Sequence, residues 1–492
     1  MNYPSWDVPH IGSGWVIGII AIIHIMFSHF AVGGGLYLPM AERKALREGR
    51  NDWLEIIHKH AKFFLILTGV FGVSTGVGIW FAIGLVNPEA TSALIHNFVF
   101  GWAIEWTFFT IELTTAAVYY YTWKRIPDEL HLKVGYVYAF FSFLTLVIIN
   151  GILTFMLTPG EAWLAVAGTG QEASKFWYAF FNPTYWPSLF LRTLTCVSLA
   201  GVWALVTASL IDGYANPELK KRVIQFSARW LVPAFFTLPV FLLWYLYMVP
   251  TEQRGLLNLG IATIGQGVFT QVTRATLITF MTSATIGAIV YFMAYRNSRD
   301  FTFGHACAVL FLALAATAST EFAREMLRKP YVIGQHMYSN GIRVKGDVER
   351  FNRDGYLATT PWATDAEREN WSRIDALAPA QPVVQPASTG QPPAPQPAVN
   401  LNDADRQAIL ARGELMFRGQ CMACHTVNGY RSIRTLLGGR DREAVGNILK
   451  MLQEHKADSP YHAYMPQLVG TAPEINALGD YLANLVAPPK PE

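Results

Sequence analysis

Eight long apolar segments constrain the fold of this chain more than any other feature of its sequence. Each is long enough to cross a bilayer as a helix, which takes about 20 residues. Only 15% of the 492 residues are charged, whereas soluble globular proteins carry about 25%. The sequence therefore predicts a mostly α-helical, polytopic transmembrane bundle and excludes a wholly soluble protein. The eight segments lie near residues 12–41, 60–86, 92–122, 133–158, 185–212, 224–249, 266–295 and 303–328.

The loops between the segments differ in charge, and this difference predicts their sides of the membrane. The loops after segments one, three, five and seven are rich in Lys and Arg, whereas the alternate loops contain only Lys175 and Arg254. Basic loops favour the cytoplasmic face. We therefore expect a multi-pass protein of a bacterial inner membrane, with the N-terminus and all residues after 330 on the periplasmic side. The first segment lacks a basic n-region and a cleavage site, so we expect a retained anchor.

The composition changes near residue 330 and predicts three parts. Residues 1–330 form the membrane bundle, residues 331–400 a periplasmic connector, and residues 401–492 a small soluble domain. Within the connector, residues 379–400 are rich in Pro, Gln and Ala, which is typical of an extended linker. The net charge of +3 and the lack of a basic stripe exclude a nucleic-acid partner.

A covalent haem-attachment motif lies in the soluble domain, at Cys421-Met-Ala-Cys424-His425. In C-x-x-C-H the two thiols bind the haem vinyl groups and the adjacent His reaches the iron. A zinc or redox CxxC site is the alternative, but a second Cys/His pair at zinc spacing is missing. Met465 is the expected sixth ligand and would raise the reduction potential; Met451 and His455 are rival ligands.

The region around this motif, residues 402–487, resembles a class I cytochrome c domain with one covalent haem c. Its last amphipathic stretch, residues 474–485, is expected to pack on the domain's first helix. Covalent haem is attached outside the cytoplasm in bacteria, so the motif and the loop charges predict the same orientation.

Ionisable residues inside the apolar segments are costly and are therefore candidates for function. Glu105 and Glu112 are seven residues apart and share one helix face, where they could carry protons or bind iron. His24 and His29 are five residues apart, about 140° around a helix, so they do not face one group. His58 and His60 lie beside Lys59 and Lys62, and we expect them at the membrane surface.

Several of these residues are expected in one layer of the outer half of the membrane. Such a layer suits haem, with His or Glu on iron and Arg on the propionates; internal ion pairs are the alternative. The layer comprises His24, Glu105, Arg192, Arg274 and Glu325.

Three motifs resemble subunit I of the cytochrome bd oxidases over about residues 10–335. They are Ala21-Ile-Ile-His24-Ile-Met-Phe followed by Gly33-Gly-Gly, the pair Ala103-Ile-Glu105 and Phe108-Phe-Thr-Ile-Glu112, and Glu325-Met-Leu-Arg328-Lys-Pro330-Tyr331. Glu321 is a rival for the position of Glu325.

The resemblance implies a function for each of these motifs. His24 and Glu325 would ligate a pair of high-spin membrane haems, of type b and possibly d, where O₂ is reduced. Glu105 and Glu112 would belong to the haem site and the proton path, and Arg328 would meet propionates. A second bd-type membrane subunit is the implied partner.

The sequence also departs from the quinol-oxidising members of that family. Arg192, in Phe190-Leu-Arg-Thr193, replaces the segment that carries a haem-ligating His, and Arg274-Ala-Thr276 replaces one that carries a Met. Arg stays protonated and does not ligate iron; both arginines could instead bind propionates. The quinol loop is shortened to about residues 250–265, and the ninth helix is replaced by the linker and soluble domain. We therefore expect electrons to enter from a periplasmic donor cytochrome through the covalent haem.

These expectations together predict a terminal oxidase that takes electrons from cytochrome c and reduces O₂ to water, with nitric oxide as an alternative substrate. A second hypothesis is a non-catalytic electron conduit between periplasmic carriers and quinone or a partner enzyme. A third is a membrane tether for the soluble domain, with ion pairs in place of membrane haems. The conduit would need further axial ligands, for which the sequence offers His29, His58, His60, His96 and His336.

Overall fold

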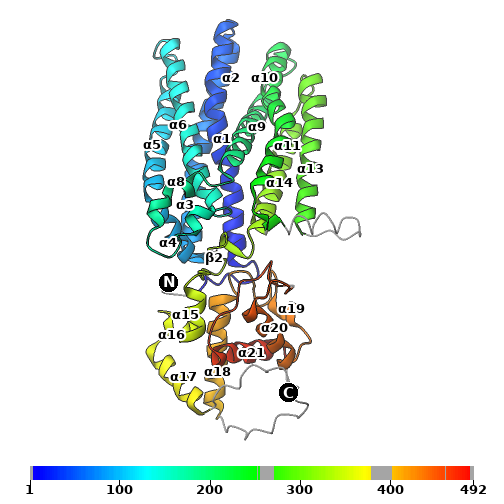
Figure 1. The fold of residues 1–492 in the computed structure, drawn as a ribbon. Helices are drawn as coiled ribbons and strands as arrows, with labels where there is room; N and C mark the ends of the chain where they lie inside the picture. The colour runs from blue at the N-terminus through cyan, green and yellow to red at the C-terminus, as the bar shows by residue number, and fades with distance from the viewer. Residues whose placement is uncertain (1–3, 252, 255–270, 378–401, 460, 488–492) are drawn as a thin grey trace. The chain divides into compact units, whose positions relative to one another are not determined.

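The computed structural model describes residues 4–251, 253–254, 271–377, 402–459 and 461–487 (Figure 1). It is mostly helical, as predicted. The chain divides into two compact units. The membrane bundle comprises Gly18–Phe81 and Leu94–Arg328, and the C-terminal unit comprises Met1–Ile17, Ala82–Ala93 and Lys329–Glu492. The expected linker at 379–400 and most of the expected shortened loop at 250–265 lie outside the described residues.

The helices of the bundle follow the predicted segments. Seven helical stretches among the described residues are long and apolar enough to cross a membrane. α5, the eighth helix expected to cross, has 23 residues and packs along α6, but it is not among those seven. The helices are α1 (Ser13–Arg47), α2 (Asn51–Ile66), α3 (Val73–Val86), α5 (Val99–Tyr121), α6 (Asp128–Phe155), α9 (Tyr185–Ser209), α10 (Pro217–Arg229), α11 (Val232–Met248), α13 (Gln271–Ile289) and α14 (Phe303–Arg328).

Shorter elements connect these helices. A π-helical turn, η1 (Leu67–Gly72), joins α2 to α3, and a second one, η3 (Val290–Arg296), extends α13. The remaining short helices are α4 (Pro88–Asn97), α7 (Glu161–Leu164), η2 (Glu172–Lys175) and α8 (Phe176–Phe180).

Three consecutive glycines let α1 approach three neighbouring helices closely. A Cβ atom on Gly33 would lie 1.9 Å from the carbonyl oxygen of Cys196 in α9. On Gly34 it would lie 2.4 Å from the Phe64 ring of α2, and on Gly35 it would lie 2.4 Å from the Tyr138 ring of α6. Small residues are what permits backbones to meet inside a membrane. α1 is therefore fixed against α9, α2 and α6 at one level of the bundle.

Aromatic side chains fill the core around this contact. Phe30 of α1 packs edge-on against Phe64, with ring centroids 4.9 Å apart, and lies 5.4 Å from the Trp203 ring of α9. Tyr37 donates or accepts a 2.9 Å hydrogen bond with Ser227 of α10. The core around this contact is thus mainly aromatic, with a hydrogen bond between Tyr37 and Ser227 at its edge.

The C-terminal unit combines a two-stranded antiparallel sheet with short helices. The strands are β1 (Tyr331–Ile333) and β2 (Met337–Tyr338), which pair through Tyr331 and Tyr338. The helices are α15 (Asp347–Asp354), α16 (Tyr356–Thr359), α17 (Asp365–Leu377), α18 (Asp403–Gln420), α19 (Ile433–Leu437), α20 (Arg442–Glu454) and α21 (Ala472–Val486).

The first and last helices of the soluble domain cross closely, as the sequence predicted. A Cβ on Gly413 of α18 would lie 2.1 Å from the carbonyl oxygen of Ala477 in α21. Beside this crossing the Phe417 and Tyr481 rings are 5.8 Å apart. α21 starts with a capping box, in which Thr471 and Glu474 satisfy each other's backbone N–H groups.

Residues 331–377 share one hydrophobic core with residues 402–487. Glu474 links the two stretches, because its buried carboxylate accepts hydrogen bonds from the backbone N–H groups of Tyr356 (2.9 Å) and Leu357 (2.7 Å). The Asp375 carboxylate also pairs with Arg412 of α18 at 2.9 Å. This stretch is therefore an integral part of the C-terminal unit and not an extended tether.

We predict that Gly33→Ala destabilises the bundle, whereas Gly69→Ala does not. The methyl group added at position 33 would overlap the α9 backbone, whereas one added at position 69 would meet no atom within 4 Å. Ala is favoured over Gly in a helix by about 1 kcal/mol, so the Gly69 variant should melt at the same or a higher temperature. Thermal unfolding of both variants in detergent checks this; equal melting temperatures for wild type and Gly33→Ala would contradict it.

Candidate functional site

The Cys-x-x-Cys-His segment forms one tight turn directly after α18. α18 ends at Gln420, and the backbone N–H groups of Cys424 and His425 both donate to the carbonyl oxygen of Cys421, at 3.1 and 3.0 Å. Both cysteines are free thiols. The turn therefore carries two thiols and an imidazole within five residues, which is what covalent haem attachment requires.

The imidazole of His425 is oriented by the loop that follows it. Its Nδ1 atom lies 3.0 Å from the carbonyl oxygen of Arg431 and donates to it. Burial lowers the pKa of His425, so the ring is neutral at neutral pH. With Nδ1–H engaged, the lone pair of Nε2 is left for a metal, the arrangement found in histidine ligands. These residues fit a c-type haem.

Gln420 ties this turn to the segment that carries Met465. Its side chain donates to the carbonyl oxygen of Val469 at 2.8 Å and accepts from the N–H of the same residue at 3.0 Å. The rival ligand His455 is engaged elsewhere, because its Nε2 lies 3.1 Å from the carbonyl oxygen of Met465. These contacts support Met465 as the sixth ligand. Gln420 was not singled out by the sequence analysis.

The N-terminal segment covers the loop after the haem motif. The N–H of Tyr430 donates to the carbonyl oxygen of His10 at 2.6 Å, and a Cβ on Gly429 would lie 2.0 Å from that same oxygen. Trp15 packs edge-on against the Tyr430 ring at 5.6 Å. No sequence pattern indicates this contact, since the two segments are more than 400 residues apart.

In the bundle, His24 is oriented by a threonine of α3. Its Nδ1 lies 3.0 Å from the Thr75 hydroxyl, whose own proton is directed to the carbonyl oxygen of Phe71 at 2.7 Å. The hydroxyl oxygen therefore accepts, His24 Nδ1 donates, and Nε2 keeps its lone pair. This is the tautomer that an iron ligand needs.

A charged cluster lies within the bundle and joins four helices. Glu321 and Arg324 of α14 form a 2.8 Å ion pair. Arg192 of α9 interacts electrostatically with both of them and with Tyr245 of α11, and its Nε donates to Ser188 at 3.3 Å. His29 of α1 is buried and interacts with Arg192 and Glu321.

This charged cluster has two guanidinium groups and one carboxylate. An uncompensated charge away from water is costly, so the surplus cation favours an anionic partner such as a haem propionate. The cluster includes Arg192, as expected, but Arg274 lies exposed on α13. His29 and Glu321, which the sequence analysis had not chosen as site residues, occupy the cluster.

The second predicted iron ligand, Glu325, forms an ion pair with Arg328 one turn later in α14. The Arg328 side chain is 11% exposed and its Nη1 lies 3.6 Å from the sulfur of Met156. The two residues of the Glu-x-x-Arg motif are thus brought together. Glu321 has its direct ion pair with Arg324 and Glu325 has its own with Arg328, while each arginine also interacts electrostatically with the other carboxylate.

The two carboxylates of α5 have different surroundings. Glu112 is buried and accepts a 2.9 Å hydrogen bond from Ser142 of α6. Glu105 lies nearly two turns earlier and is partly buried. Both therefore lie on the side of α5 that faces the bundle, in agreement with the shared face predicted from their spacing.

The two histidines of α2 do not share one environment. His58 is partly exposed and stacks on Trp123, with ring centroids 5.0 Å apart. His60 is only 2% exposed and bonds the Thr207 hydroxyl at 3.0 Å. The His60 side chain thus points to the core of the bundle, because α2 turns this face towards α9; its level near the membrane surface stays a prediction.

A buried network that the sequence analysis missed links α1, α5 and α6. Glu42 accepts from the Tyr119 hydroxyl at 2.7 Å, and its other oxygen lies 2.7 Å from His131 Nδ1. His131 Nε2 in turn lies 2.7 Å from the carbonyl oxygen of Tyr119. All three side chains are at most 3% exposed. Their separation in sequence hides the network, although a Glu at the end of an apolar segment is a signal.

We predict that Gln420→Leu weakens the sixth ligand of the covalent haem. The substitution keeps the side chain's size but removes both hydrogen bonds to Val469, so the Met465 segment is released from the motif. Since Met ligation raises the potential relative to other ligands, the potential of the c-type haem should fall. Redox titration of the c band checks this, with Gln407→Leu at an exposed position of α18 as control; an unchanged potential in Gln420→Leu would contradict the assigned role.

Comparisons with known proteins match the bundle. The family model of cytochrome bd terminal oxidase subunit I covers residues 13–253. Cytochrome bd-II ubiquinol oxidase subunit 1 of Escherichia coli (strain K12) is 26% identical over 181 residues, which are 36% of this chain and 34% of that protein. The aligned region is thus about a third of that relative's length.

A solved structure agrees in fold. The bd oxidase from Geobacillus thermodenitrificans superimposes with a TM-score of 0.51 at 14% sequence identity, covering 65% of this chain and 87% of that chain. This likeness shows the fold of the membrane bundle. Over residues 13–253, the bundle is similar in sequence to the cytochrome bd terminal oxidase subunit I family.

Proposed function

We propose that this chain is the catalytic subunit of a membrane oxidase that takes electrons from an external cytochrome c and reduces O₂. The observation that carries the proposal is a haem-attachment turn, with His425 correctly oriented, in the same chain as a bd-type bundle. The family supports haems b and d as membrane cofactors, a second membrane subunit and O₂ as acceptor. The haems supply one-electron carriers and an open iron position for O₂.

The proposal assigns a set of residues to each of these groups. Cys421, Cys424, His425 and Met465 would hold the covalent haem c. In the bundle, His24 offers a free Nε2, and Glu325 is the proposed carboxylate ligand. The surplus cation of the Arg192–Glu321–Arg324 cluster would bind propionates, together with Arg328. Arg274 is exposed, and its proposed binding of a propionate rests only on its position in the sequence.

The proposed electron donor follows from positions 192 and 274, where this chain lacks the two low-spin haem ligands of the quinol-oxidising members. In the described bundle, position 192 carries a guanidinium that interacts with Glu321 and bonds Ser188. A guanidinium cannot replace an imidazole on iron, because it stays protonated. The low-spin haem that would accept electrons from quinol thus loses a ligand, and the periplasmic c-type haem is the remaining entry.

Protons for O₂ reduction would come through the carboxylates of α5. Glu112 holds the Ser142 hydroxyl as a donor, and Glu105 lies nearly two turns along the same helix. Both can accept and release a proton between the interior and the haem site. The loop charges support the proposed orientation in a bacterial inner membrane, with the haem c unit outside.

We predict that His24→Ala removes one CO-binding membrane haem and leaves the c band unchanged. The variant loses the only imidazole that Thr75 orients, whereas the attachment turn is untouched. Reduced spectra with and without CO measure this, with His305→Ala as a control. An intact membrane haem content would exclude His24 as a ligand. Low-spin bands that do not respond to CO in the wild type would instead support an electron conduit.

We predict that the double variant Cys421→Ser, Cys424→Ser loses covalent haem and cytochrome c-driven O₂ uptake. Without the two thiols the haem cannot be retained on a denaturing gel. The CO-binding membrane haem should remain, since it depends on other residues. The rates of O₂ uptake with reduced cytochrome c and with a quinol identify the electron donor. Rapid quinol oxidation by the wild type would refute the proposed donor. Faster reduction of nitric oxide than of O₂ would change the proposed acceptor.

A further inference from the structure

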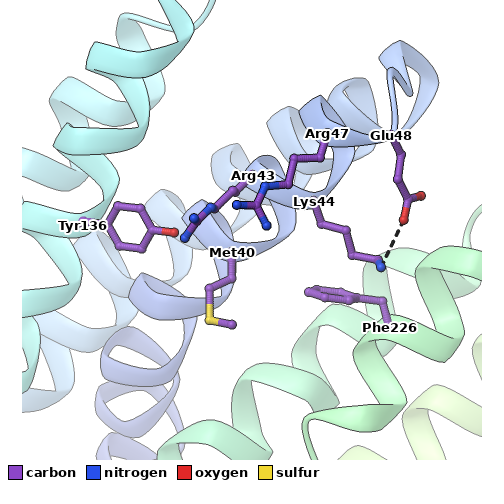
Figure 2. A pocket seen from close by; sticks show the side chains of 7 residues that line it. All are labelled: Met40, Arg43, Lys44, Arg47, Glu48, Tyr136 and Phe226. Carbon is purple, nitrogen blue, oxygen red and sulfur yellow. Dashed lines mark ion pairs between the residues drawn. The ribbon is translucent and has the colours of Figure 1, made fainter.

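A basic pocket lies at the C-terminal end of α1, between α6 and α10 (Figure 2). Its volume is about 540 Å³. Three of its lining residues are cationic and come from the last two turns of α1. One carboxylate, one tyrosine and two apolar side chains line the rest. The lining residues are Met40, Arg43, Lys44, Arg47, Glu48, Tyr136 and Phe226.

The charges of this basic pocket are not balanced by the protein. The carboxylate of Glu48 is shared by Lys44 at 3.0 Å and by Arg222 of α10 at 3.1 Å. Among the described residues, Arg43 and Arg47 form no ion pair. The lining therefore carries three cations against one carboxylate, and that carboxylate already has two partners.

The spacing of the two arginines makes the imbalance unfavourable without an anion. Arg43 and Arg47 are four residues apart and lie on the same helix face, where like charges repel. The helix dipole favours cations in the last turn. It does not by itself explain why two guanidinium groups share one pocket. An anion between them removes the repulsion and uses their planar donor geometry, which suits phosphate oxygens.

The remaining lining indicates the kind of anion. Figure 2 shows the Tyr136 hydroxyl turned towards the Arg43 guanidinium, where it can donate to the same anion. Met40 is 43% exposed, and with Phe226 it offers an apolar surface beside the cations. A ligand with a phosphate group and an adjoining apolar chain satisfies both parts of the lining.

We propose that this basic pocket binds a phosphate-ester anion, the headgroup of an anionic phospholipid. The loop charges predict that this end of α1 lies at the cytoplasmic surface. Basic pockets between transmembrane helices on that side bind such headgroups. Arg43 and Arg47 hold the phosphate, Tyr136 donates to it, and the acyl chains leave along Met40 and Phe226. The site is independent of the proposed haem chemistry.

The test compares the double variant Arg43→Ala, Arg47→Ala with a control double variant of equal net charge, Lys221→Ala, Arg296→Ala. Both control residues are exposed and form no ion pair in the described part of the chain. The intact purified complex is placed in phosphatidylcholine nanodiscs with and without phosphatidylglycerol, and bound lipid is counted by native mass spectrometry. Each cation near an anionic surface changes affinity about fivefold, so we expect about 25-fold weaker retention of phosphatidylglycerol in the first variant.

Several outcomes would overturn the proposal. Equal retention in wild type and in the Arg43, Arg47 variant would exclude these arginines, and equal loss in the control would show a general surface charge effect. Displacement of phosphatidylglycerol by millimolar inorganic phosphate or glycerol phosphate would assign the pocket to a soluble phosphate instead. The haem spectrum of each variant shows that it is folded, and Arg43→Lys, Arg47→Lys should restore part of the retention.

Discussion

The close approach of α1 to three other helices is the contact on which the bundle depends. Gly33, Gly34 and Gly35 allow it because each lacks the Cβ that would strike α9, α2 or α6. α1 also carries His24 and His29 on one side of this contact and the basic pocket on the other. The positions of these groups relative to Thr75, Arg192 and Tyr136 are therefore set by one packing contact.

Charge compensation is the second constraint, and the chain meets it differently in different places. Glu42 is fully satisfied by Tyr119 and His131, and Glu474 by the backbone of Tyr356 and Leu357. These groups hold the fold together. By contrast, the Arg192 cluster and the basic pocket each keep surplus positive charge. In the buried cluster an unbalanced charge is costly, whereas in the basic pocket the surplus comes from exposed guanidinium groups on one helix face. Both places are therefore candidate sites for anions.

The C-terminal unit shows how a short motif is made into a site by distant segments. The C-x-x-C-H turn alone places two thiols and an imidazole together. Gln420 connects it to the Met465 segment, Arg431 orients His425, and the His10 backbone covers the loop after it. Residues 331–377 complete the same core, so the haem motif is embedded in more of the chain than the motif predicts.

The sequence by itself determined the helical bundle, its segment boundaries to within a few residues in most cases, and the crossing of α18 with α21. It could do so because apolar length and helical periodicity are local properties. It also predicted which residues carry haem chemistry. Only the tertiary structure decided that Arg192 joins Glu321, Arg324 and His29, that Arg274 stays exposed, and that His60 is buried. These outcomes depend on how helices rotate against one another, and rotation is fixed by contacts such as Gly33 on Cys196, between residues far apart in the sequence.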